Sequence, residues 1–264
     1  MLEDREVFWL VDQLDAFRHP DLQRDRHCLP AIDRSIPHDH GVFGACESGN
    51  LVEVAAFLDS GVSVYAQHGN RPSLLATAIK NGDLPMVGLL ISRGLNIERP
   101  IHGFREFPIL RAIKEKQWAI VDYIFSLGTD LNREDEYGVS IFRIACCGIT
   151  PPEWIVRMIN LGADMDHRWR GETPFFEAAR GQALDVMDVL RNHGADINGK
   201  NSENMTPLIC SAQGGREASV RWLIDHGADL RHVEARDRDA LNWAQRNGHE
   251  AIADLLRRKL GGAD

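Results

Sequence analysis

Long apolar segments are missing from this sequence. No run approaches the roughly 20 apolar residues that a membrane-spanning helix needs. Residues 1–6, MLEDRE, lack the basic start of a signal peptide, and no small-residue cleavage site follows them. These two absences predict a cytoplasmic protein that does not contact a membrane.

Cysteine is scarce, with five residues in a chain of 264. Cys46, Cys146 and Cys210 fall at or beside positions that hold small residues elsewhere in the chain, where a free thiol packs as a small apolar group. Cys28 and Cys147 complete the set, and the spacing forms no disulfide framework. We therefore expect all five thiols to be reduced.

Catalytic motifs are also missing. The sequence contains no Gly-x-Ser-x-Gly elbow, no His-Glu-x-x-His helix, no kinase signature and no dinucleotide fingerprint. Residues 194–201, GADINGKN, are one residue short of a phosphate-binding loop, but Asn201 stands where Ser or Thr should hold magnesium, and Gly194 ends a helix-like stretch. We expect a protein that is not an enzyme. A site built from residues far apart in the sequence remains an open alternative.

A weak metal-binding pattern lies near the N-terminus. His27 and Cys28 precede residues 38–40, His-Asp-His, at a distance that could gather zinc ligands. Prolines interrupt the intervening segment, and no Cys-x-x-Cys pair supports the pattern. We interpret these histidines as solvent-exposed or capping residues, and we expect no metal and no cofactor.

Positive charge is in deficit. Lys and Arg number 30 against 39 Asp and Glu, and the formal charge is −9. This charge opposes non-specific attraction to nucleic acid and suits a basic partner. Hydrophobic residues at 44% and charged residues at 26% are ordinary values for a folded soluble protein.

Against these absences stands a regular repeat of glycine. Six glycines recur 32 to 34 residues apart, and each closes a similar helix-like stretch. They are Gly61, Gly94, Gly128, Gly162, Gly194 and Gly227. A fixed period of this size is typical of a repeat protein, in which length counts repeats rather than domains.

The residues around three of these glycines are alike. Residues 162–164 read GAD, 194–198 read GADIN and 227–230 read GADL, and the next copies contain Thr173-Pro174-Phe175 and Thr206-Pro207-Leu208. At these residues the chain resembles the ankyrin-repeat family, whose period is about 33 residues. The resemblance covers roughly residues 38–260. It implies a solenoid of helix pairs joined by hairpin loops, and a binding scaffold whose partner differs from one member to the next.

Seven repeats are expected, and we number them one to seven. Their ranges are 38–66, 67–99, 100–132, 133–166, 167–199, 200–232 and 233–260. The predicted fold is therefore an all-α, curved ankyrin-repeat solenoid of about seven repeats. Residues 1–37 are expected to form an N-terminal helical cap segment, and residues 38–264 the repeat domain. Phe8, Trp9 and Leu14 belong to an amphipathic pattern that predicts a helix, which either covers the first repeat or docks on another protein.

Each of the first six repeats carries an apolar pair seven and four residues before its glycine. Residues at this spacing share one helical face, so each pair forms a stripe that only a neighbouring repeat can bury. The pairs are Val54 and Phe57, Val87 and Leu90, Val121 and Ile124, Ile155 and Met158, Met187 and Leu190, and Val220 and Leu223. Small residues in the first helices allow close approach: Ala45, Ala78, Ala112, Ala145, Ala178 and Ala212.

The resemblance also implies where binding occurs. In ankyrin stacks the hairpin tips and first helices form a concave face, and Phe104, Tyr137 and Trp169 fall at tip positions of three consecutive repeats. Aromatic residues with arginines beside them dominate protein interfaces. The predicted protein-binding residues are Phe104, Glu136, Tyr137, Arg168, Trp169, Arg170, Met205, Arg236 and Arg238. In the alternative interpretation, a tip aromatic packs on the neighbouring hairpin and binds nothing.

The function predicted from these patterns is a non-enzymatic scaffold that binds one protein partner through its concave face. The negative charge suggests an inhibitor or immunity-type neutraliser of a basic partner. A delivered effector or adaptor that recruits a host protein is the alternative, and an enzyme with a site built into the stack is the second alternative. We expect a monomer that does not bind nucleic acid.

Overall fold

The computed structural model describes residues 39–67, 72–101, 107–135 and 137–261. These residues form 14 helices and no strand, with two isolated bridges in hairpin loops, Glu134 to Ser140 and Trp169 to Glu172. The all-α prediction is therefore confirmed for the described chain. The predicted N-terminal helix, His27, Cys28, Phe104 and Glu136 lie outside the described residues.

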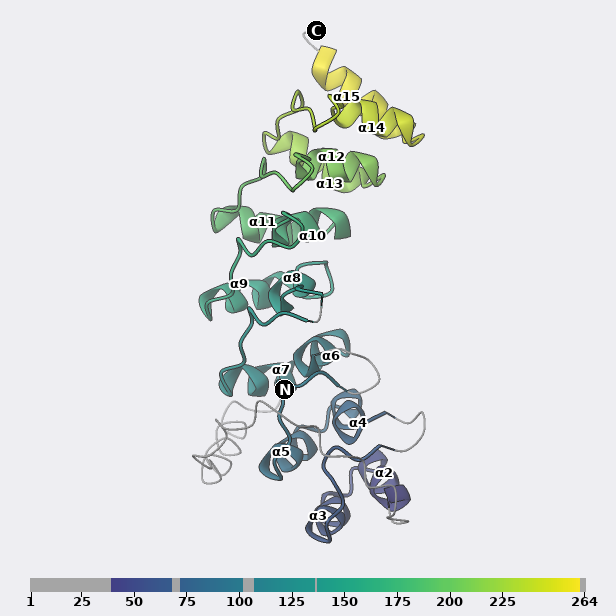
Figure 1. The fold of residues 1–264 in the computed structure, drawn as a ribbon, viewed down its shortest axis with the longest axis vertical. Coiled ribbons are helices and arrows are strands. Elements are labelled where there is room, and N and C mark those ends of the chain that lie inside the picture. Colours follow the sequence, from purple (N-terminus) through teal and green to yellow (C-terminus); the bar gives the residue numbers. More distant parts are fainter. Residues whose placement is uncertain (1–38, 68–71, 102–106, 136, 262–264) are drawn as a thin grey trace. The chain divides into compact units, whose positions relative to one another are not determined.

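The described residues fall into two compact units, the first ending at Thr129 and the second beginning at Asp130. The helices of the first unit are α2 (Asp39–Glu47), α3 (Leu51–Asp59), α4 (Leu74–Asn81), α5 (Leu84–Ser92), α6 (Pro108–Lys114) and α7 (Trp118–Ser126). Within this unit α2, α4 and α6 are neighbours in one row, and α3, α5 and α7 are neighbours in a second row (Figure 1).

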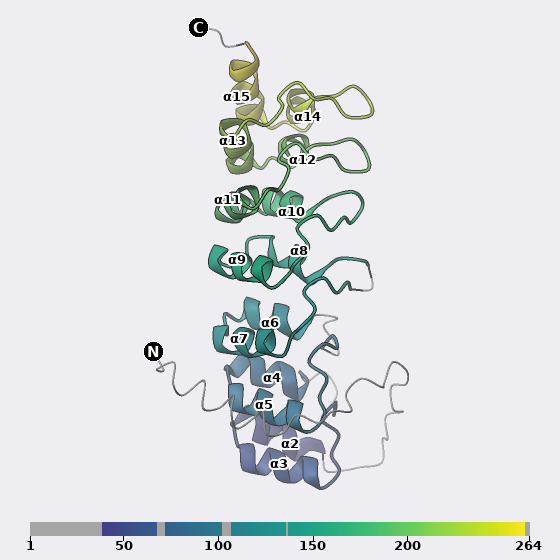
Figure 2. The same cartoon turned by 90° about the vertical axis from the view of Figure 1, so that its left-hand side faces the viewer.

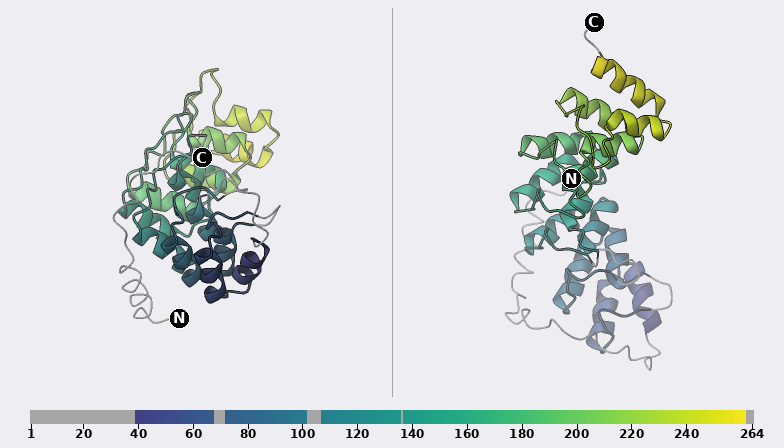
Figure 3. Two further views of the ribbon diagram at one scale, coloured as in Figure 1. Left: turned by 60° about the horizontal axis from the view of Figure 1, so that its bottom comes forward. Right: turned by 45° about the horizontal axis from the view of Figure 1, so that its top comes forward.

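The second unit repeats this arrangement with four helix pairs. They are α8 (Ile141–Ala145), α9 (Pro152–Asn160), α10 (Pro174–Gly181), α11 (Leu184–Asn192), α12 (Pro207–Gln213), α13 (Glu217–Asp225), α14 (Ala240–Arg246) and α15 (Glu250–Gly261). The first helices α8, α10, α12 and α14 form one row, and α9, α11, α13 and α15 form the other (Figure 2). The pair α14 and α15 lies at one end of this unit (Figure 3). Each range expected to hold a repeat thus holds two helices.

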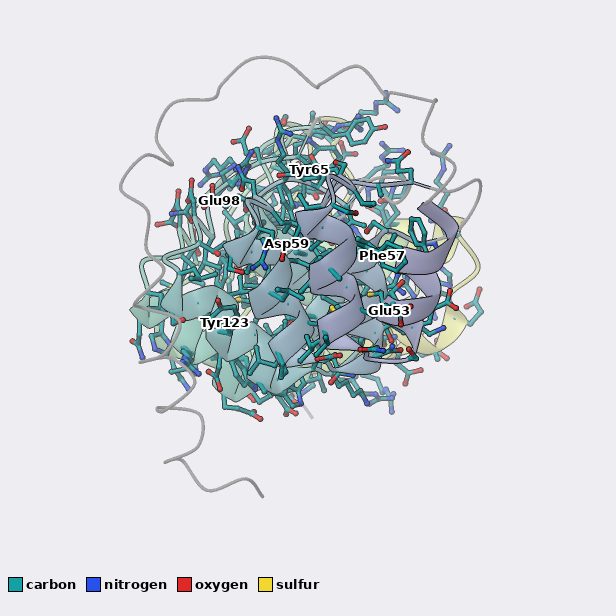
Figure 4. All side chains as sticks on the ribbon, turned by 90° about the horizontal axis from the view of Figure 1, so that it is seen from below. Glu53, Phe57, Asp59, Tyr65, Glu98 and Tyr123 are labelled. Carbon is teal, nitrogen blue, oxygen red and sulfur yellow. The ribbon has the colours of Figure 1, made fainter. Side chains whose placement is uncertain are left out.

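The core of each unit is the apolar stripe predicted from the sequence. Of the twelve paired residues, eleven are buried, and the small alanines of the first helices are buried with them. Phe57 is the exception and is half-buried. Its ring packs on Gly41, where a Cβ atom would meet the ring at 2.5 Å. Glu53 and Phe57 are seen on α3 in Figure 4. Each aliphatic side chain buried in the stripe stabilises the folded state by roughly 1.5–3 kcal/mol relative to an exposed one.

Glycines and a capping threonine close ends of the helices. All six period glycines adopt a positive φ, between 75° and 101°, which relieves a conformation that a side chain would make costly. The Thr206 hydroxyl accepts a hydrogen bond from Ile209 N at 3.4 Å, as expected of a capping residue. Thr173 does not cap with its side chain, because its backbone carbonyl already accepts from Phe176 N at 3.0 Å.

A hydrogen-bonded rung, in which a side chain four residues after a period glycine bonds to the next repeat, follows Gly61, Gly128 and Gly194. Asn132 donates from Nδ2 to Gly162 O at 3.0 Å, and its Oδ1 accepts from Asp164 N at 2.7 Å. In the first unit the Tyr65 hydroxyl has the same two roles, donating to Gly94 O and accepting from Asn96 N at 2.8 Å. Figure 4 shows Tyr65 in the loop after α3.

No helix in the described part of the chain combines the length and the apolar character required to cross a membrane.

Candidate functional site

The hairpin tips of the second unit lie side by side. We define the tip row as the described residues of 134–139, 167–172, 200–205 and 233–238. These loops project from the ends of the first helices, on the opposite side from α9, α11 and α13 (Figure 2). The tip row is therefore the surface of this unit that the predicted binding residues occupy.

Hydrogen bonds connect each tip in the row to the next. Trp169 donates from Nε1 to Tyr137 O at 2.6 Å. Ser202 N donates to Arg170 O at 3.3 Å, and Ala235 N donates to Glu203 O at 3.4 Å. Four repeats thus present one continuous edge, whose loops hold one another in place.

Three of the four tips close with the same local chemistry. Asp135, Asn201 and Glu234 occupy equivalent positions, and a side-chain oxygen of each accepts a hydrogen bond from the backbone N–H two residues later, at 2.9 to 3.0 Å. The backbone N–H of each of these residues donates to the carbonyl four residues later, at 2.9 to 3.0 Å. A carboxylate or amide oxygen at this position closes the loop from within.

The tip of repeat five departs from this scheme. Arg168 occupies the equivalent position, and a guanidinium group cannot accept a hydrogen bond. The loop closes one residue later, through a pair of backbone hydrogen bonds between Trp169 and Glu172 at 3.1 and 3.0 Å. Arg170 and Gly171 form the turn with φ of 53° and 79°, the left-handed conformations of a type I′ hairpin.

Trp169 is the aromatic centre of this tip. Its half-buried ring lies against two guanidinium groups, with Arg170 4.5 Å and Arg143 5.3 Å from the ring centroid. These distances are within the range of cation–π attraction. The indole is thus held by cation–π attraction to the two guanidinium groups and by its hydrogen bond to Tyr137 O. Arg170 remains exposed.

A buried charge network lies beneath Trp169. Arg143 is 1% exposed, and its guanidinium donates to Glu172 O at 2.7 Å, to Glu172 Oε2 at 3.1 Å and to Glu177 Oε1 at 2.5 Å. Arg180 closes the network with contacts of 2.7 Å to Glu172 and 2.6 Å to Glu177. Burial alone would raise the pKa of Glu172, but hydrogen bonds and positive charge from Arg180 and Arg143 outweigh burial and lower it.

The structure divides the predicted binding residues into three groups. Tyr137 is 65% exposed, and Arg168, Arg170 and Arg236 are exposed with it. Trp169 and Arg238 are half-buried, and Arg238 pairs with Glu234 at 2.6 Å and lies 4.1 Å from the Trp243 ring centroid. Met205 is 4% exposed and packs in the interior, so we leave it out of the surface proposed below. Phe104 and Glu136 fall outside the described residues.

Sequence reasoning missed the network around Arg143. The equivalent residues of the next two repeats are Phe176 and Ile209, both buried, so an arginine in this position was the available signal. Glu172 also stands where repeat six has the buried Met205. A cation and a carboxylate that replace apolar residues in adjacent repeats indicate a pair.

Three of the four cysteines in the described chain, Cys46, Cys146 and Cys210, have thiols that react poorly. Burial raises the pKa of Cys46 and Cys210 to about 12, and burial raises the pKa of Cys146 further. A thiol of this kind is protonated at neutral pH and reacts poorly. The described residues contain no group of three or more His, Cys, Asp or Glu side chains placed to hold a metal ion.

Comparison with known proteins finds ankyrin repeats in the second unit of this chain. The family model for ankyrin repeats in three copies matches residues 141–234 and 198–264. YahD of Escherichia coli, a protein named for its ankyrin repeats, is 26% identical over 197 residues, which cover 71% of this chain and 96% of YahD.

Two longer proteins match over part of their length. Alpha-latrocrustotoxin-Lt1a of Latrodectus tredecimguttatus is 30% identical over 112 residues, covering 42% of this chain and 8% of the toxin. Human transient receptor potential cation channel subfamily A member 1 is 25% identical over 178 residues, covering 64% of this chain and 16% of the channel. This chain therefore spans only a small part of these two relatives. The family model for ankyrin repeats thus matches residues 141–264, and residues 39–129 hold helix pairs of the same design.

Proposed function

We propose that this chain is a protein-binding scaffold and that the tip row of the second unit contacts the partner. Ankyrin repeats indicate a protein–protein interaction scaffold, and nothing in the described chain shows catalytic activity. The tip row supports the finer proposal because its loops are hydrogen-bonded to one another and present a fixed surface. A preformed surface loses little conformational entropy on binding.

One observation carries this proposal, namely the group of Tyr137, Trp169 and Arg170 on adjacent tips. Tyr137 is largely exposed, and its backbone carbonyl holds the Trp169 indole, which in turn lies against Arg170. Tyr, Trp and Arg are the residue types enriched among binding hot spots, which lie near the centre of an interface. The group lies in the middle of the chain rather than at a capping end.

The finer predictions from the sequence stay predictions. An inhibitor of a basic partner is supported only by the net charge of −9, and the exposed arginines of the tip row do not favour it. No described residue favours an effector that recruits a host protein, or an enzyme site, over a plain scaffold. A monomeric state and a cytoplasmic location are likewise proposals.

The test begins with capture of a partner by the purified full-length chain, followed by calorimetry with variants. We expect Trp169→Ala and Tyr137→Ala each to cost about 2 kcal/mol of binding free energy, roughly a 30-fold loss of affinity. The melting temperature should change little in Tyr137→Ala, because that side chain is exposed. Trp169→Ala also removes the hydrogen bond to Tyr137 O, so its loss of folding stability should be present but smaller than its loss of binding free energy.

Trp154→Ala is the matched control. Trp154 is also half-buried and lies 5.1 Å from the Arg157 guanidinium, but it is on α9, away from the tip row. Full affinity in the Trp169 and Tyr137 variants would move the binding site elsewhere. A loss of affinity accompanied by an equal loss of stability would support the alternative in which the tip aromatics are structural.

A further inference from the structure

The tips of repeats five and six differ in charge from the chain as a whole. Arg168, Arg170, Lys200 and Arg236 are exposed, and within the described residues none of them has a carboxylate at ion-pair distance. Arg238, the remaining arginine of the tip row, pairs with Glu234, and beneath the row Arg143 and Arg180 pair with Glu172 and Glu177. The unneutralised cations are concentrated at the tips of repeats five and six.

The carboxylates of the same surface are largely occupied. Asp135 accepts hydrogen bonds from Tyr137 N and Val139 N, both at 2.9 Å. Glu134 contacts His167 Nε2 at 2.8 Å. Glu203 is exposed, and Lys200 is on the same tip. At the tips of repeats five and six the cations Arg168, Arg170 and Lys200 outnumber the carboxylates Glu172 and Glu203, and Glu172 is already paired with Arg143 and Arg180. An approaching group therefore meets an excess of positive charge at these two tips, although the chain as a whole is negative.

The tip of repeat five has arginine at two positions, 168 and 170, where other residue types would suit the local backbone better. An acceptor at position 168 would close the hairpin as in the other three tips. Arg168 instead donates from Nη1 to Gly171 O at 3.0 Å and Lys200 O at 3.2 Å, which fixes its guanidinium between two tips. Arg170 holds a left-handed φ of 53° that favours Asn or Gly in this type of turn. Local rules are broken most often at functional sites.

We propose that the tips of repeats five and six dock an acidic segment of a protein partner. Resting on the proposed function, this inference assigns Arg168 and Arg170 to carboxylates of that segment and Trp169 to the apolar side chain between them. Guanidinium groups bind carboxylates through paired, charge-assisted hydrogen bonds. A polynucleotide would meet the same cations, but the net charge of −9 opposes it and leaves the acidic protein segment as the occupant.

The experiment selects short random peptides displayed on phage against the full-length chain, then measures the synthesised peptides by calorimetry. We expect the selected peptides to be enriched in Asp and Glu beside an aromatic or aliphatic residue. Their affinity should fall about tenfold or more for Arg168→Gln and for Arg170→Asn, and should weaken as salt is added. Arg191→Gln is the matched control, because Arg191 is an exposed arginine on α11.

Arg170→Asn separates binding from folding. Asn suits the left-handed turn position better than Arg, so the melting temperature should hold or rise while the affinity falls. A structural role for Arg170 would instead lower both quantities together.

Three results overturn the proposal. The first is selection of neutral or basic peptides, or of none. The second is acidic peptides whose affinity is unchanged in both arginine variants. The third is a single-stranded oligonucleotide that binds more tightly than the peptides with the same dependence on Arg168 and Arg170. Non-acidic peptides that still require Trp169 would refute this inference alone, whereas peptides indifferent to Trp169 and Tyr137 would also refute the proposed function.

Discussion

The rungs between repeats predict that replacing one carboxylate by an amide will stabilise the protein. In the rung from repeat three to repeat four, Asn132 donates to Gly162 O and accepts from Asp164 N. In repeat five, Asn198 Oδ1 accepts from Asp229 N of repeat six at 2.8 Å. Repeat four has Asp166 at the equivalent position, and within the described residues its carboxylate makes no such bond to repeat five. A carboxylate cannot donate to a carbonyl, so Asp166 cannot complete the rung.

The magnitude follows from the bonds that Asp166→Asn would add. The amide adds a donor toward Gly194 O, and that bond would place its oxygen to accept from Asp196 N; these are the equivalents of the two partners of Asn132. Each net hydrogen bond contributes about 0.5–1.5 kcal/mol, and exposed bonds fall at the lower end. The two together should raise the free energy of unfolding by about 1 kcal/mol. For a chain of this size that corresponds to roughly 2–4 °C in melting temperature.

Urea denaturation gives the free energy, and hydrogen exchange locates the effect. The Asp196 amide should exchange more slowly in Asp166→Asn than in the natural chain. Asn132→Ala is the opposite control and should lose about 1 kcal/mol by removing a complete rung. An unchanged midpoint together with an unchanged Asp196 exchange rate would refute the reasoning that the rung is what Asp166 lacks.

Two further predictions concern Tyr65 and Glu172. Tyr65→Phe removes the hydroxyl that joins Gly94 O and Asn96 N, and should cost about 1 kcal/mol in urea denaturation, whereas a cost near zero would show that water replaces the rung. Glu172→Gln should cost about 2 kcal/mol near pH 7, because Arg143 stays buried with one carboxylate fewer. The pKa of Glu172 is lowered by folding, so its contribution is present above the unfolded value of about 4.3 and is lost as the pH falls through the lower folded value. Stability curves of the two chains should therefore converge in acid, and a constant gap down to low pH would contradict this.

The repeating part of the fold could be predicted from the sequence because it depends on local chemistry. Gly162 and Gly194 end helices with a positive φ, as their period indicated. Met158 and Leu190 are fully buried, because a stripe at helical spacing has only a neighbouring repeat to pack against. Predicting these features does not require knowing which residues of neighbouring repeats are in contact.

The parts that could not be predicted depend on pairs between repeats. Arg143 and Glu172 are 29 residues apart in the sequence, and each charge is tolerated in the interior because it pairs with the other. Met205 was expected at the binding surface from its tip position, yet the hairpin turns its side chain inward. The type I′ turn at Arg170 and Gly171 depends on the absence of an acceptor at Arg168, which is visible only beside the other three tips. The binding role of the tip row stays a prediction.

The most direct measurement of the central claim is hydrogen exchange on the full-length chain with and without its captured partner. The account predicts that slowed exchange on binding is concentrated in residues 134–139, 167–172 and 200–205, with Trp169→Ala abolishing the effect at the same partner concentration. Slowed exchange confined to α9, α11 and α13, with the tip row unchanged, would contradict it.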